Sequence, residues 1–108
     1  MALHHVEAGE IARLSPLGKD LQNIRTYALV KTNCFETVRL VIPAGTRIAE
    51  HLVEGPVTLH CLEGKFTLAR KAGNITMEAD DWVHLDPGEP HALEALEDTS
   101  VLVTIIFP

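Results

Sequence analysis

The chain has 108 residues, enough for a single domain with a buried core, and 46% of them are apolar. Fifteen acidic against nine basic residues give a formal net charge of -6 and a pI near 5.4, which argues against a nucleic-acid-binding protein and against binding to an anionic membrane. No apolar run reaches the ~18 residues of a membrane span, and the first residues lack the basic and apolar stretches of a secretory signal, so we expect a cytoplasmic protein.

Residues 1–25 are expected to form an N-terminal arm that covers part of a sheet, while residues 26–108 form the domain itself. Within the arm, residues 10–15 are periodic enough for one or two turns of helix, which Pro16 and Gly18 would end. The arm is therefore the one place where the pattern predicts a helical turn.

From residue 26 onward the chain consists of short β-type runs interrupted by turn residues. Alternation is clearest in residues 35–42, where Val38, Leu40 and Ile42 share one face. The other runs have similar lengths and flanking turns: residues 27–32, 57–62, 66–70, 74–78, 82–85, 91–96 and 101–107. Turn residues at such short, regular intervals are typical of an all-β sandwich or barrel.

Residues 101–107 differ from the other runs because they are apolar at nearly every position, which requires both faces to be covered. One face can pack into the core, whereas the other, with Leu102 and Ile106, needs the arm or a second subunit. An exposed apolar patch of this kind marks an interaction site, and twofold pairing is the commonest closed assembly. We therefore predict a homodimer to which Trp82 or Tyr27 contributes.

Two segments have the spacing of known metal-ligand motifs. Residues 45–64 fit the pattern G-x5-H-x-H-x3-E-x6-G with both glycines in place and His51 at the first histidine, but Val53 replaces the second histidine and Val57 replaces the glutamate. Residues 85–91, Leu-Asp-Pro-Gly-Glu-Pro-His, match a second motif in which a Pro/Gly turn delivers one more histidine, here His91.

On these motifs, residues 26–107 resemble a small single-domain member of the cupin superfamily, of the RmlC-like kind. The resemblance departs from the family pattern again at Asp80, where glycine is usual, and at Ala95, where asparagine or an equivalent is usual. It implies a double-stranded β-helix, also called a cupin barrel or jelly roll, with a ligand pocket inside. Members with intact motifs are dioxygenases, isomerases and decarboxylases that bind iron, manganese, nickel or zinc, whereas others are metal-free binding or sensing domains.

Two of the four usual ligands, His51 and His91, remain in this chain. A transition-metal site normally has at least three protein ligands, so any divalent iron, manganese, nickel or zinc ion is expected to bind weakly. His60 is the candidate third ligand, but regular alternation places it on the outer face of its strand unless a β-bulge intervenes. The pocket is expected to be lined by the two histidines and three apolar side chains: Val53, Val57 and Leu59.

Three functions stay open at this point. The first is a protein that binds a small-molecule ligand in the barrel, with a degenerate metal centre. The second is a mononuclear metal-dependent oxygenase or isomerase that uses His51 and His91. The third is a mainly structural dimerisation module. None of them involves nucleic acid or a membrane as partner.

The remaining polar and reactive side chains are expected to have structural roles. Arg39 lies opposite the apolar row of its strand. An arginine in such a place can bind a carboxylate bidentately, but more often its stem covers apolar surface while its head stays in water. Glu89 is near enough to reach the barrel mouth, although exposure is its default. Cys34 and Cys61 are expected to be two buried free thiols, and Cys61 should behave as a small hydrophobe.

Overall fold

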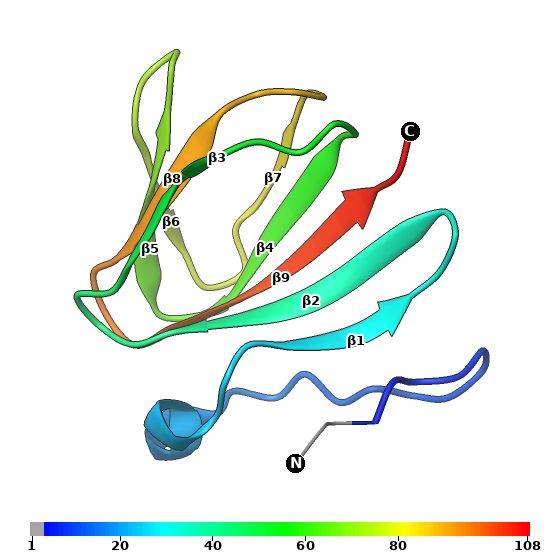
Figure 1. The fold of residues 1–108 in the computed structure, drawn as a ribbon. Coiled ribbons are helices and arrows are strands. Elements are labelled where there is room, and N and C mark those ends of the chain that lie inside the picture. The colour runs from blue at the N-terminus through cyan, green and yellow to red at the C-terminus, as the bar shows by residue number, and fades with distance from the viewer. Residues whose placement is uncertain (1–3) are drawn as a thin grey trace.

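The computed structural model describes residues 4–108, and in that range it contains nine strands and one short 3-10 helix, η1 (Figure 1). The elements follow in chain order: η1 (Gly18–Asn23), β1 (Tyr27–Lys31), β2 (Phe35–Ile42), β3 (Arg47–His51), β4 (Val57–Glu63), β5 (Lys65–Arg70), β6 (Ile75–Glu78), β7 (Trp82–Leu85), β8 (His91–Ala95) and β9 (Thr99–Ile106). The predicted all-β architecture is confirmed.

The strands form two antiparallel sheets that face each other across the core (Figure 1). The larger sheet has the order β1-β2-β9-β4-β7, and the smaller has the order β3-β8-β5-β6. Strands far apart in sequence are neighbours, since β2 pairs with β9 along its whole length, from Phe35 opposite Ile106 to Ile42 opposite Thr99. This crossing connectivity is that of a jelly roll.

The core follows from the alternation of apolar residues along the strands. On β4, Val57, Leu59 and Cys61 are at most 2% exposed, whereas Thr58 and His60 between them are half-buried on the other face. Period-two alternation places successive side chains on opposite faces. The buried cluster joins side chains from both sheets: Ile42, Val57, Leu59, Cys61, Phe66, Leu68, Met77, Leu85, Leu93, Ala95, Val101 and Val103.

The predicted helical turn is wrong in its position. Residues 10–15 are not helical, and the 3-10 helix lies later, at Gly18–Asn23, where Leu21 is 1% exposed. So short a segment cannot stabilise a helix by itself, and tertiary contacts decide instead. The arm before it is irregular, with a turn at Ala8 and Gly9, and the Val6 N–H donates to the Leu29 carbonyl of β1 over 2.8 Å.

Strand β3 (Arg47–His51) was absent from the predicted runs. Four of its five residues are exposed, so it lacks the apolar alternation by which a strand is recognised in sequence. Its pairing with β8 also shifts register between Ile48 and His51. An exposed, irregular edge strand of this kind gives little periodic signal.

The N-terminal arm is joined to the larger sheet through a buried ion pair. Arg39, expected to keep its head in water, is 1% exposed, and its Nη2 donates to Glu63 Oε2 over 3.1 Å and to the Ser15 carbonyl over 2.9 Å. The backbone N–H groups of Leu17 and Gly18 donate to the same Glu63 carboxylate over 2.9 and 3.1 Å. The preferred expectation for Arg39, a head in water, was wrong because it ignored the groups that the arm brings to that face, whereas the alternative of a carboxylate partner agrees with the pair to Glu63.

These contacts set the ionisation of Glu63. Burial raises its pKa, but hydrogen bonds from Leu17, Ser100 and Gly18 and the charge of Arg39 together bring that pKa below its ordinary value of 4.5. Glu63 is therefore an anion at neutral pH, although its side chain is only 13% exposed. Three donors and a cation compensate a carboxylate that would otherwise be costly to bury.

The prediction for the cysteines was right for one of them. Cys61 is fully buried, and burial raises the pKa of its thiol to about 11. Cys34 is exposed in the turn between β1 and β2. The pattern failed for Cys34 because a turn residue has no periodic neighbours from which burial can be inferred.

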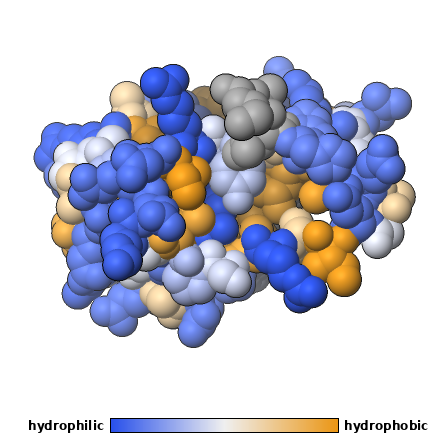
Figure 2. All heavy atoms as spheres, turned by 90° about the horizontal axis from the view of Figure 1, so that it is seen from below, coloured by the Kyte–Doolittle hydropathy of each residue, from blue (hydrophilic) through white to orange (hydrophobic). Residues whose placement is uncertain are grey.

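The surface seen from the side of the arm is mainly hydrophilic, with apolar groups visible between the polar ones (Figure 2). Elsewhere Trp82 is 58% and Ile106 38% exposed, while Leu102 between β2 and β4 is half-buried. The homodimer stays a prediction. No helix within residues 4–108 is long and apolar enough to cross a membrane.

Candidate functional site

Three residues meet in one cross-strand row at the end of the smaller sheet. In the register of this sheet, His91 at the start of β8 lies opposite His51 on β3 and opposite Arg70 on β5. Residues directly opposite in antiparallel strands project from the same face. His91 shares its face with buried Leu93 and Ala95, so the row faces the barrel interior at its mouth. We call His51, His91 and Arg70 the mouth row.

The register shift on β3 brings His51 into this row. Ile48 packs against the core and pairs with Leu93, while His51, three residues later, pairs with His91, only two residues from Leu93. In a regular strand, His51 would face away from the side of Ile48. The extra residue restores the inward face, as a β-bulge does.

The two imidazoles lie side by side, with ring centroids 4.4 Å apart and planes tilted by 56°. They are thus on different strands and close together, as the motif spacing predicted. His51 Nδ1 lies 3.1 Å from the Ala49 carbonyl oxygen, and His91 Nδ1 lies 3.0 Å from that of Glu89. A carbonyl oxygen can only accept, so Nδ1 carries the proton and Nε2 of the neutral ring carries the lone pair. His91 is 4% exposed, whereas His51 is exposed.

Arg70 and Glu89 form an ion pair beside the histidines. Arg70 Nε donates to Glu89 Oε2, and the Asp86 N–H donates to Glu89 Oε1 over 3.2 Å. The Arg70 hydrogen bond is the main cause that lowers the pKa of Glu89 below 4.5; burial opposes it, and the Asp86 N–H and the charges of Arg70 and His91 add to it. The Glu89 side chain is 17% exposed, so the default expectation of exposure is wrong.

A closed metal site does not form from these groups. His60 faces outward from β4, opposite Trp82 and Leu102, because β4 stays regular from Val57 to Cys61. Within the described part of the chain, no three His, Cys, Asp or Glu side chains are placed to hold one ion. Two imidazoles are fewer than the three ligands of an ordinary transition-metal site, so the residues do not fit a tightly bound metal.

The predicted apolar lining lies partly in the core. Val57 and Leu59 are 2% and 1% exposed and belong to the buried cluster, whereas Val53 is half-buried and packs against it. The Val53 carbonyl accepts a 2.8 Å hydrogen bond from the Gly88 N–H. This bond ties the Pro/Gly turn before His91 to the segment after His51.

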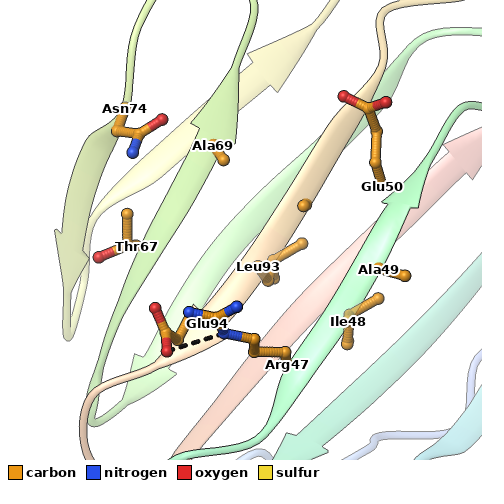
Figure 3. Close-up of a pocket in the computed structure, with 10 residues that line it drawn as sticks. Arg47, Ile48, Ala49, Glu50, Thr67, Ala69, Asn74, Leu93 and Glu94 are labelled. Atoms are coloured by element: carbon orange, nitrogen blue, oxygen red, sulfur yellow. Dashed lines mark hydrogen bonds and ion pairs between the residues drawn. The ribbon is translucent and has the colours of Figure 1, made fainter.

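A separate trough of about 380 Å³ lies on the outer face of the smaller sheet (Figure 3). Its floor is made of small side chains, and the exposed Arg47–Glu94 ion pair, Nε to Oε2 3.0 Å, lies at one end. The lining comes from three strands, β3, β5 and β8, and from the loop before β6: Arg47, Ile48, Ala49, Glu50, Thr67, Ala69, Asn74, Ala92, Leu93 and Glu94. The trough was not predicted from the sequence, because its small side chains, Ala49, Ala69 and Ala92, lie at outward positions of three separate strands.

The cupin domain model matches residues 38–107, which is more than half of the chain. The chain belongs to the cupin family. Among solved structures, a conserved protein of unknown function from Streptococcus pyogenes is 20% identical over 100% of this cupin and 98% of that chain, with a TM-score of 0.79. An RmlC-like cupin from Desulfovibrio desulfuricans is 20% identical over 94% and 97%, with a TM-score of 0.71.

A cupin superfamily protein from Desulfitobacterium hafniense is 14% identical over 77% of this cupin and 76% of that chain, with a TM-score of 0.74. No curated protein matches the chain. These identities are all low, so the structural likeness concerns the fold alone. It agrees with the two-sheet jelly roll described above.

Proposed function

We propose that this cupin binds a small organic molecule at the barrel mouth, with His51 and His91 as its polar contacts and without a resident metal. The paired imidazoles carry this proposal, since one is nearly buried and their ring centroids are 4.4 Å apart. A few convergent polar groups beside apolar side chains are typical of small-molecule sites. Hydrogen bonds to backbone carbonyls fix both rings before any ligand arrives.

The replaced ligands favour binding without a metal. Val53 and Val57 stand at the family's other two ligand positions, and neither side chain can coordinate an ion. A hydrocarbon in place of a ligand makes the mouth less able to hold a charged ion, and half-buried Val53 is suited to contact the apolar part of an organic molecule. The hydrophobic effect contributes about 25 cal/mol per Å² of apolar surface that such a molecule buries.

A metal-dependent oxygenase or isomerase is the second candidate, favoured by one observation. Both rings donate through Nδ1 and keep Nε2 for a ligand, which is the arrangement seen in metal-binding histidines. In this function His51 and His91 would hold a divalent iron, manganese, nickel or zinc ion, with water or substrate at the remaining positions.

Elemental analysis separates the two candidates. Protein purified without added metal is expected to hold well under one equivalent of any transition metal, because two imidazoles do not make a closed site. About one tightly held ion per chain, lost in His91→Ala, would contradict the proposal. Restoring both ligands with Val53→His and Val57→Glu should raise the affinity for zinc. This variant also tests whether the backbone still places the four ligand positions around one ion.

A fragment screen followed by NMR tests binding itself. Fragments that bind should shift the ring signals of His51 and His91 and leave those of His84, an exposed histidine on β7, unchanged. His91→Gln should weaken binding, and His84→Gln should not. Fragments that bind only elsewhere, for example in the outer trough, would refute the mouth as the site.

A further inference from the structure

We infer that the molecule bound at the barrel mouth carries a carboxylate and that Arg70 recognises it. The inference rests on the function proposed above and adds the chemical class of the ligand. It is drawn from the third member of the mouth row, which lies outside both sequence motifs.

Arg70 is placed to reach a ligand that touches His91. It lies directly opposite His91 at the end of β5 and has the inward parity of Phe66 and Leu68, both 0% exposed. Its side chain is 27% exposed, so it is partly desolvated without being enclosed in the core. A guanidinium in this place is accessible from the mouth, and it attracts an anion more strongly than a guanidinium in bulk water does.

The hydrogen bonds of Arg70 orient its head and leave donors free. Only Nε is engaged within residues 4–108, by Glu89 Oε2. A guanidinium has five N–H groups, so the two Nη nitrogens can give two parallel hydrogen bonds to a carboxylate. Because Glu89 holds the plane of the guanidinium, less conformational entropy is lost when a ligand binds.

The charges at the mouth favour a monoanion over a dianion. Arg70 is already paired with Glu89, so the two side chains together carry no net charge, and the whole chain has a formal charge of -6. A phosphate dianion would need further cations to offset its desolvation. A carboxylate needs only the free fork of Arg70, and its organic part can lie against half-buried Val53, which follows His51 by two residues.

Arg47 provides a matched control. It also pairs through Nε with a glutamate, Glu94, but on the outer face, where the two side chains are 77% and 41% exposed. The two arginines thus share one ion-pair geometry and differ in location and burial. An exposed arginine of this kind contributes little to binding an anion because water and salt screen it.

The test uses benzoate and its neutral analogue benzamide in NMR titrations that follow the ring signals of His51 and His91. Benzoate is expected to shift both signals and to bind at least about tenfold more tightly than benzamide, because its carboxylate accepts charge-assisted hydrogen bonds that a neutral amide does not. Arg70→Gln should weaken the binding of benzoate by a similar factor and leave the binding of benzamide unchanged. Arg47→Gln should change neither, and Arg70→Lys, which keeps the charge but not the fork, should be intermediate.

The outcomes distinguish the two proposals. If benzamide binds as tightly as benzoate and Arg70→Gln affects neither, the mouth is a binding site but its ligand is no carboxylate. If benzoate binding survives Arg70→Gln and is lost in His51→Gln, the assignment to Arg70 is wrong. If no probe and no fragment shifts the ring signals, both the carboxylate inference and the proposed function are wrong. Arg70→Lys serves as the reporter should Arg70→Gln fold poorly.

Discussion

Replacing Arg39 with methionine is expected to lower the free energy of unfolding by about 3–5 kcal/mol, because it leaves the buried Glu63 carboxylate without its cation. The Arg39 side chain is 2% exposed and that of Glu63 is 13% exposed, so water screens the pair poorly. Small domains have total stabilities of about 5–15 kcal/mol. The loss is therefore a large fraction of what holds this cupin folded.

The geometry around Arg39 sets this magnitude. Besides Glu63 Oε2, the guanidinium donates to the Ser15 carbonyl over 2.9 Å and to Ser100 Oγ over 3.2 and 3.3 Å. A hydrogen bond from a charged group contributes about 1.5–3 kcal/mol, and these bonds share one side chain, so the values do not add. Methionine restores part of the lost apolar contact and places the expected cost near the lower end of the range.

The free energy of unfolding is measured by urea denaturation, monitored by far-UV circular dichroism, with Arg47→Met as the matched control. The Arg47–Glu94 pair has a contact of similar length, 3.0 Å from Nε to Oε2, but it is exposed, so its loss is expected to cost less than about 1 kcal/mol. In Arg39→Met/Glu63→Leu both charges are gone, and stability should recover in part. If Arg39→Met costs no more than Arg47→Met, the view that this ion pair fastens the arm to the sheet is refuted.

Three further results are expected. The pKa of Glu63 is lowered in the folded state, so its ionised form contributes fully to the free energy of unfolding above about pH 4.5, and this contribution is lost as the pH falls through the folded-state pKa. The urea midpoint should therefore drop in that acidic range, and Glu63→Gln should make the drop smaller. A thiol reagent should modify exposed Cys34 in the native protein and reach buried Cys61, whose pKa is about 11, only on unfolding; equal rates would contradict this burial. Gly55→Ala should lower the free energy of unfolding by at least about 1–3 kcal/mol, measured by thermal denaturation, because a Cβ would lie 1.8 Å from the Ile106 carbonyl oxygen; an unchanged midpoint would mean that the backbone there can move.

The sequence predicted most strands because burial on one face imposes alternation. The bounds of β2 and β7 were predicted as the structure has them, and the inward row of β4 was correct. Strand β3, residues 47–51, was not predicted because both of its faces are largely exposed, so its sequence does not alternate. The arm failed for a different reason, since its conformation depends on Arg39 and Glu63, which are distant in sequence.

For the candidate site, motif spacing predicted that His51 and His91 come together, and the ring distance of 4.4 Å agrees. It did not predict Arg70, because a motif records ligand positions and says nothing of register. Which residue of β5 lies opposite His91 is fixed by the pairing of whole strands, with a one-residue slip reversing every face. The parity of Arg70 with Phe66 and Leu68 was the only signal in the sequence that could have found it.

The loss of two metal ligands need not disturb the mouth row, because each histidine is fixed locally. His51 bonds to the carbonyl of Ala49 and His91 to that of Glu89, in both cases two residues earlier in the chain. Strand pairing then sets the two rings against each other, and Glu89 orients Arg70 on the other side of His91. None of these contacts requires an ion. A barrel that has replaced ligands with Val53 and Val57 therefore still presents two oriented imidazoles and a guanidinium to its mouth, which is the arrangement that an organic anion would use.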